Sequence, residues 1–193
     1  MMPRVKLDVQ MIMQAAADIA DKEGLDEVTL ASLSKKLGIR SPSLYNHVDG
    51  LNGVRHKLAL YGMKQLNEAL TYAAIGRAQD EAIHEIAQAY IRFAREHPGL
   101  YDALVRMPDW NDEETNKVAR LPVDLLVRVL QAYGLEGDAA IHTVRGLHSL
   151  LHGFASLEQT GNFNIPIDPD YSLQLLIDFF LKGIRAYGNE MES

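Results

Sequence analysis

The stretch from residue 29 to residue 48 constrains this chain more than any other, because it predicts two short helices joined by a single glycine. Thr29 precedes leucines spaced three and four residues apart, so it is expected to cap the first helix. Gly38 supplies the left-handed backbone conformation that ends this helix. Ser41 and Pro42 are expected to begin the second helix, as a hydroxyl cap and as a proline at the first helical position.

The second of these helices is expected at about 42–48 and has two different faces. Leu44 and Val48 lie four residues apart and can face inward. The polar side chains that remain outside are Ser43, Asn46 and His47. Two short helices joined in this way form a helix-turn-helix, which places its second helix in the major groove of DNA.

The net charge of −7 argues at first against a nucleic-acid partner, but the charge is unevenly distributed. Residues 1–57 carry a net charge of +1, whereas the rest of the chain carries −8. Within residues 35–57 the only acid is Asp49, and the basic side chains are Lys35, Lys36, Arg40, Arg55 and Lys57. Phosphate binding needs local positive charge, so an acidic remainder is compatible with DNA binding by one end of the chain.

Nearly every apolar repeat along the 193 residues has the period of a helix, and no segment has a convincing strand period. The sequence therefore predicts an all-α fold of about nine helices, in which a three-helix N-terminal head is joined through a long helix to a larger C-terminal bundle. Asp80 and Asp138 are expected to cap helices of that bundle. Pro122 is expected where another helix is interrupted or restarts.

Composition narrows the classes of protein further. The chain has no cysteine, which excludes disulfides, thiolate metal sites and a thiol nucleophile. No apolar run is long enough to span a membrane, and the first residues lack a signal-peptide pattern, so we expect a cytoplasmic protein without a membrane partner. Serine and histidine occur without a nucleophile elbow or a glycine-rich phosphate loop, so we expect no catalytic residues.

The last two long helices, expected at 138–159 and 171–187, carry apolar side chains around most of their circumference. Such helices must be covered on more than one side. Burial at the centre of a monomer is one explanation; the favoured one is pairing with the same helices of a second copy in a twofold dimer. The residues expected in that interface are Leu147, Leu151, Leu173, Leu176, Phe180 and Ile184.

Two segments of the head carry a family resemblance. They are Lys36-Leu37-Gly38-Ile39 and Leu44-Tyr45-Asn46-His47-Val48, with Pro42 between them. Over about residues 8–57 the sequence resembles the DNA-binding domain of TetR-family transcriptional regulators. The resemblance implies that residues 1–50 are a helix-turn-helix DNA-binding domain and that residues 51–193 are a helical domain for effector binding and dimerisation. His152-Gly153-Phe154 is similar to the branch with a Trp-His-Gly motif, although Leu151 replaces the tryptophan.

The resemblance also implies which residues contact DNA. Those that match contacting positions in and before the second helix are Arg40, Ser41, Pro42, Ser43, Tyr45, Asn46 and His47. Thr29 is expected to reach a phosphate together with its helix N-terminus. Many family members have a phosphate-binding lysine where this chain has Leu51, so Arg55 or Lys57 is expected to replace it. The N-terminal arm offers only Arg4 and Lys6 to a minor groove.

The C-terminal domain is expected to hold a pocket for an unknown small-molecule effector. Aromatic and methionine side chains line such pockets between helices, but they also fill ordinary cores. The candidate wall residues are Tyr90, Phe93, Tyr101, Met107, Trp110, His148 and Phe154. His148 and His152, four residues apart, could share a metal ion, but no carboxylate accompanies them at a matching interval, so we expect no metal and no cofactor.

The favoured function is a ligand-responsive transcriptional repressor that binds palindromic double-stranded DNA as a homodimer and is released by a small-molecule effector. An effector-dependent activator and a DNA-binding architectural protein without a ligand are the alternatives. An all-helical enzyme is disfavoured because the chain offers no catalytic constellation.

Overall fold

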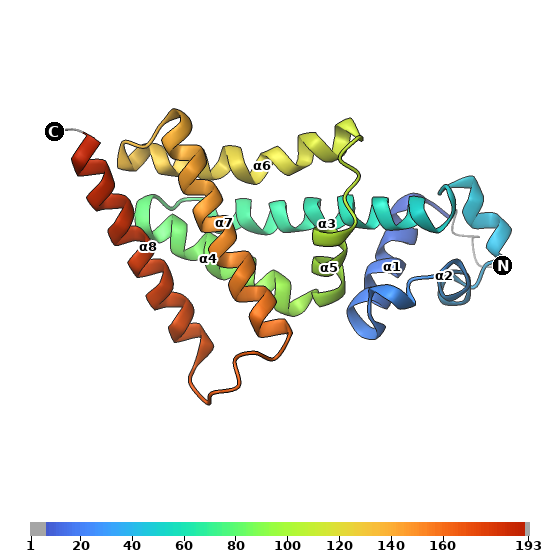
Figure 1. Ribbon diagram of the computed structural model, residues 1–193. Coiled ribbons are helices and arrows are strands. Elements are labelled where there is room, and N and C mark those ends of the chain that lie inside the picture. Colours follow the sequence, from blue (N-terminus) through green and yellow to red (C-terminus); the bar gives the residue numbers. More distant parts are fainter. Residues whose placement is uncertain (1–6, 192–193) are drawn as a thin grey trace. The chain divides into compact units, whose positions relative to one another are not determined.

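The computed structural model describes residues 7–191, with side chains to residue 186 (Figure 1). These residues contain no strand, so the prediction of an all-α fold is confirmed. The elements in chain order are α1 (Val9–Glu23), η1 (Leu25–Glu27), α2 (Leu30–Leu37), η2 (Ser41–Asn46), α3 (Gly50–Ala74), α4 (Gln79–Glu96), α5 (Pro98–Arg106), α6 (Glu113–Leu130), η3 (Gln131–Tyr133), α7 (Gly137–Gln159) and α8 (Pro169–Met191), where η denotes a 3₁₀ helix. With η2 counted beside the eight α-helices, the described residues contain the expected nine.

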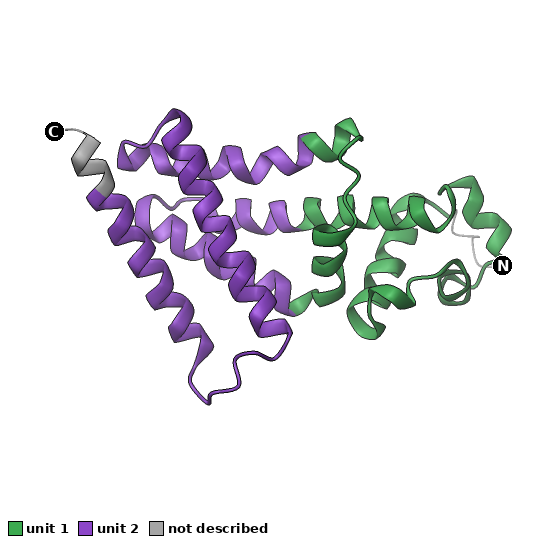
Figure 2. Ribbon diagram, viewed as in Figure 1, with its two compact units in different colours: residues 1–65, 96–116 green, residues 66–95, 117–193 purple. Residues whose placement is uncertain are grey.

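The chain divides into two compact units (Figure 2). Unit 1 comprises residues 1–65 and 96–116, and unit 2 comprises residues 66–95 and 117–193. The boundaries between them fall inside α3, before the last residue of α4 and inside α6, so each of these helices contributes residues to both units.

Helices α1 and α5 are tied together inside unit 1. The carboxylate of Asp21, near the end of α1, accepts a hydrogen bond from the backbone N–H of Leu100 at 2.9 Å. Its other oxygen lies 3.0 Å from Nδ1 of His97. Between these contacts, Gly99 lies so close to Ala20 that an added Cβ would come within 2.0 Å of the Ala20 carbonyl oxygen. The approach of α5 to α1 therefore depends on the missing side chain.

Helix α8 is held in unit 2 by ionic contacts as well as by its apolar face. The apolar side chains of Leu173, Ile177 and Leu181 are buried at one-turn spacing. Asp80 of α4 accepts hydrogen bonds from the Tyr133 hydroxyl at 2.7 Å and from Arg185 of α8 at 2.6 Å. The apolar side chains and Arg185 therefore hold α8 to the rest of the unit, and Asp80 joins α4 to η3 as well.

Three expected helix boundaries are wrong. Pro122 lies inside a continuous α6, so that helix is neither interrupted nor restarted there. Glu136, not Asp138, occupies the cap position of α7. Asp80 lies in the first turn of α4, where its carboxylate binds Tyr133 and Arg185 rather than the helix N-terminus. At Asp80 a tertiary contact outweighs the local capping signal.

None of the helices within residues 7–191 combines the length and apolar character that a membrane crossing requires.

Candidate nucleic-acid interface and internal cavity

The first helix of the predicted helix-turn-helix is confirmed in detail. The Thr29 hydroxyl accepts a hydrogen bond from the Ser32 backbone N–H, and the Ser32 hydroxyl accepts one from the Thr29 N–H, both at 3.0 Å. This reciprocal capping box begins α2. Gly38 ends it in the left-handed conformation, with φ 64° and ψ 31°. Because the Thr29 hydroxyl serves the cap, the group that α2 offers to a phosphate is its N-terminal backbone.

The second helix of the motif differs from the expectation in type and position. It is the six-residue 3₁₀ helix η2, and the long helix α3 begins at Gly50. Arg40, not Ser41, occupies the cap position, and no side chain caps this helix. The Ser41 hydroxyl instead meets that of Ser34 on α2 at 3.0 Å. Tight i to i+3 hydrogen bonds, such as Ser43 N–H to the Arg40 carbonyl, suit so short a segment.

The two faces of η2 are those that the sequence predicts. Leu44 and Val48 are buried, with 0% and 3% of their surface exposed. Tyr45 is 61% exposed. The remaining candidate contacts are exposed at Arg40, Pro42 and Asn46 and half-buried at Ser41, Ser43 and His47. An exposed guanidinium and an exposed amide are the groups that read guanine and adenine through paired hydrogen bonds.

Basic side chains near this surface are partly engaged within unit 1. Lys36 forms an ion pair with Asp18 of α1 at 3.2 Å. Nε of Arg55 is buried without a hydrogen-bond partner among the described residues. Hydrogen bonds from Thr115 lower the pKa of Asp112, and the nearby charge of Lys57 contributes to that shift. Arg4 and Lys6 lie outside the described residues.

Unit 2 contains an apolar cavity of about 120 Å³ between α3, α4, α6 and α7. Of the seven residues that the sequence suggests for an effector pocket, Tyr90 and His148 lie in its wall. The apolar wall residues are Leu66, Leu70, Ile86, Ala119, Pro122, Val123, Leu126, Val144, Leu147 and Leu151. The contribution of α6 was not expected from the sequence; its signal is the helical spacing of Ala119, Pro122, Val123 and Leu126.

The other five suggested pocket residues lie elsewhere. Tyr101, Met107 and Trp110 belong to unit 1, where Tyr101 is buried and Trp110 is 59% exposed. Phe93 and Phe154 are buried in unit 2 but do not line this cavity. Phe154 packs edge-to-face on Phe163 with their ring centroids 4.9 Å apart.

His148 is an exposed residue of the cavity wall and, beside the buried Tyr90, one of its two titratable groups. Its ring meets Tyr90 edge-to-face, with centroids 6.2 Å apart, and lies 6.3 Å from the ring of His152. Desolvation of its ring lowers the pKa of His148, and repulsion from His152 lowers it further, so the neutral imidazole is favoured. The described residues contain no group of three or more side chains able to hold a metal ion.

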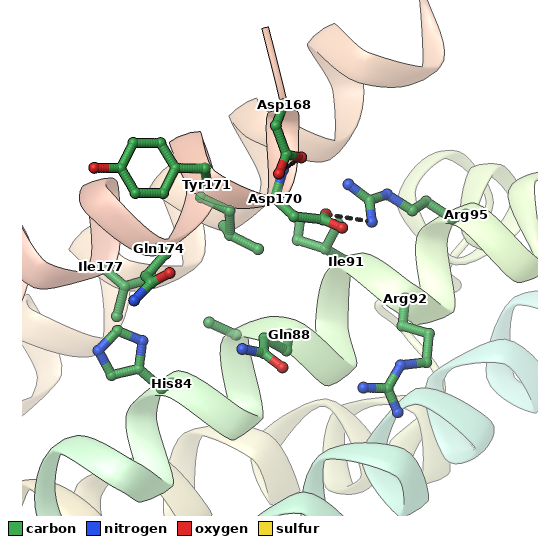
Figure 3. A pocket seen from close by; sticks show the side chains of 12 residues that line it. His84, Gln88, Ile91, Arg92, Arg95, Asp168, Asp170, Tyr171, Gln174 and Ile177 are labelled. Carbon is green, nitrogen blue, oxygen red and sulfur yellow. Dashed lines mark hydrogen bonds and ion pairs between the residues drawn. The ribbon is translucent and has the colours of Figure 1, made fainter.

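A second, larger cleft of about 370 Å³ lies between α4 and the start of α8 (Figure 3). From α4 it is lined by His84, Gln88, Arg92 and Arg95, whose spacing marks one helix face that the sequence analysis did not use. Arg95 donates to Glu158 at 2.8 Å and to Asp170 at 2.7 Å, and both carboxylates, Glu158 foremost, raise the pKa of its guanidinium. Nε2 of His84 lies 2.9 Å from Asp178. Arg95, Asp170 and His84 of this cleft are therefore engaged in ionic contacts.

The six residues expected in a dimer interface separate into two groups. Leu147, Leu151, Leu173 and Ile184 are buried within the single chain. Leu176 and Phe180 keep partial exposure on α8.

Comparisons with known proteins agree on one class. The family described as Tetracyclin repressor-like, C-terminal domain, matches residues 83–180. YobS of Bacillus subtilis (strain 168), described as an uncharacterized HTH-type transcriptional regulator, is 41% identical over 185 residues, which cover 95% of this chain and 96% of that protein. Rv0681 of Mycobacterium tuberculosis, described in the same words, is 38% identical over 157 residues, or 81% of this chain and 72% of that protein.

A solved structure shares the fold. The crystal structure of TetR from Acinetobacter baumannii AYE matches 94% of this chain and 98% of its own with a TM-score of 0.72, at 16% identity. Fold, helix-turn-helix and relatives thus define a helix-turn-helix transcriptional regulator. The chain belongs to the TetR family.

Proposed function

We propose that this regulator is a repressor that binds palindromic operator DNA as a homodimer and is released by a small molecule in the cavity of unit 2. The observation that carries the proposal is the exposed polar face of η2, formed by Arg40, Tyr45 and Asn46 over the buried Leu44. Family membership supports the DNA-binding role of this face. Since such a regulator acts where the DNA lies, a cytoplasmic location is part of the proposal.

Exposed apolar side chains support the homodimer. Among the large apolar side chains that are exposed in the described residues, six of 13 lie between residues 157 and 179. They are Leu157, Phe163, Ile165, Ile167, Tyr171 and Phe179. Three of them, Phe163, Ile165 and Ile167, line one surface hollow. Exposed apolar surface that gathers in one region is typical of an interface. A twofold dimer would also present two copies of η2 to successive half-sites about 34–36 Å apart.

Ligand control requires that an effector bind one conformation of the dimer better than the other. Helix α3 connects the two sites in one element, because Arg55 lies near its start and Leu66 and Leu70 line the cavity farther along it. A ligand that shifts this helix relative to the walls of the cavity can therefore change the geometry of the DNA-binding head.

The proposal is tested by selecting a binding site from random duplexes with the purified protein and measuring affinity by fluorescence anisotropy. We expect an inverted repeat and an affinity that falls steeply with salt. Arg40→Ala and Asn46→Ala should each weaken specific binding by about 1–3 kcal/mol, because each removes a paired hydrogen-bonding group.

The matched control is Arg128→Ala, which removes one exposed positive charge from α6 in unit 2. It should retain specific affinity and the same half-site preference. If all three variants bind the selected duplex like the wild type, η2 is not the reading element. A promoter–reporter assay with and without the protein distinguishes repression from activation, and loss of repression with an added metabolite pool tests ligand control.

A further inference from the structure

We infer that the effector is a small uncharged molecule, about the size of one aromatic ring, with a single polar group that hydrogen-bonds to His148. The inference concerns the apolar cavity of unit 2 and rests on the proposed ligand response. It names the chemical class of the ligand from the size of the cavity, the character of its wall and its one polar corner.

The volume of the cavity limits the size of the ligand. The cavity holds about 120 Å³, which is similar to an engineered apolar cavity of about 150 Å³ that binds benzene in another protein. Interiors are closely packed, so a bicyclic ligand would have to displace side chains from four helices. A single ring or a short branched chain fits without such displacement.

The side chains of the cavity wall limit the charge of the ligand. Every lining side chain is apolar except Tyr90 and His148, and none is an acid, a lysine or an arginine. Among the apolar side chains of the wall, a carboxylate, phosphate or ammonium group would lose its hydration without gaining a counter-charge. The wall therefore selects uncharged ligands.

His148, an exposed residue, supplies the polar group at the solvent-facing side of the cavity. Its ring makes no hydrogen bond among the described residues, and its polar neighbours are the ring of Tyr90 and, one turn along α7, that of His152. A neutral imidazole carries one donor and one acceptor, so it can pair with a hydroxyl or a carbonyl of the ligand. The lowered pKa of His148 agrees with this neutral form.

The larger cleft beside α8 is less suited to this role. In Figure 3 the guanidinium of Arg95 is bonded to Asp170, and Glu158 holds the same side chain. A ligand that used Arg95 or Asp170 would have to break ion pairs that already satisfy these two side chains. The cleft is the larger space, but its ionic contacts join α4 to α8 and serve the fold.

The test measures binding of matched single-ring probes to the full chain by calorimetry and ligand-observed NMR. Benzyl alcohol is the neutral polar probe, toluene the apolar one, and benzoate and benzylammonium the charged ones. We expect benzyl alcohol to bind at least tenfold more tightly than either charged probe. Equal or tighter binding of benzoate or benzylammonium, or no binding of either neutral probe, would overturn the inference.

Two variants locate the bound probe. Val123→Phe, which fills the cavity from α6, should abolish binding of both neutral probes while selected DNA is still bound. His148→Leu should lower the affinity for benzyl alcohol by about tenfold and leave that for toluene within about twofold. The control is His142→Leu, an exposed histidine of the same helix outside the wall. If His148→Leu and His142→Leu retain the same preference for the alcohol, the polar contact is refuted.

The outcomes for ligand class and for repression are separable. If benzyl alcohol binds as expected but DNA affinity does not change, the ligand class stands and the proposed release mechanism fails. If the neutral probes do not bind while a charged metabolite relieves repression, the proposed function stands and the inferred ligand class fails.

Discussion

Gly99 illustrates what one residue decides in this protein. The sequence around it, His97-Pro98-Gly99, predicts only the end or bend of a helix. In the structure this turn starts α5 against α1, and Asp21 binds both His97 and the N–H of Leu100. The absent side chain at Gly99 is what permits the approach, because the carbonyl of Ala20 occupies the space that a Cβ would need.

Gly99→Ala should therefore destabilise the protein by at least about 2 kcal/mol, since the new methyl group must push two backbones apart. The measurement is urea unfolding followed by circular dichroism. Gly153→Ala on α7 is the matched change, because no atom lies within 4 Å of the new methyl group. It should be neutral or slightly stabilising, and equal midpoints for both variants would contradict the packing argument.

Among the helices, α8 shows how an element is held by a few charged groups. Burial alone would raise the pKa of Asp80, but hydrogen bonds from Tyr133 and Arg185 outweigh it, and the pKa lies below the usual 3.8. A carboxylate with a depressed pKa in the folded state stabilises the fold above its unfolded pKa. This stabilisation is lost as pH falls through the lower, folded value.

Asp80→Asn should lower the free energy of unfolding at pH 7 by about 0.5–1 kcal/mol, a small value because the pair is partly exposed. The difference from wild type should begin to shrink near pH 4, about the pKa of the unfolded carboxyl, and vanish as pH falls through the lower pKa of the folded one. Thermal unfolding between pH 2.5 and 7 measures it. Asp124→Asn on α6 removes an exposed carboxylate and should show no such trend; a pH-independent difference for Asp80→Asn would disprove the linkage.

For the whole molecule, the arrangement of apolar surface bears on assembly. Four of the residues expected in the dimer interface are buried in the core of the single chain, namely Leu147, Leu151, Leu173 and Ile184. A second copy would therefore contact the other faces of α7 and α8. Phe179 is 61% exposed on α8. Burying such a side chain contributes about 1.5–3 kcal/mol per copy to association.

Phe179→Asp should therefore shift the protein from dimer to monomer at micromolar concentration and weaken operator binding accordingly. Sedimentation velocity over a range of concentrations measures the shift. Tyr72→Asp is the control, since Tyr72 is 73% exposed on α3, and it should leave the assembly unchanged. A wild-type protein that sediments as a monomer at every concentration would contradict the homodimer itself.

Some features of the candidate sites depend on residues close in sequence, and others depend on residues distant in sequence. Some features of the DNA-binding head follow from contacts within four residues, and the structure confirms them. They are the capping box of Thr29, the turn at Gly38 and the inward face of Leu44 and Val48. The aromatic content that suggests a pocket contains no information on which helices meet. The pocket residues suggested by the sequence therefore include both Trp110, which belongs to unit 1, and His148, which lies in the wall of the cavity in unit 2.

The amino-acid sequence by itself determined the all-α class and the helix-turn-helix, because helical periodicity and helix caps depend on neighbours along the chain. The family was indicated by the resemblance that residues 36–39 and 44–48 carry. The tertiary structure alone decided that η2 is a 3₁₀ helix, that α6 continues through Pro122, and that the cavity lies between α3, α4, α6 and α7. A cavity is the space that several packed helices leave unfilled, so its position depends on side chains that are distant in sequence.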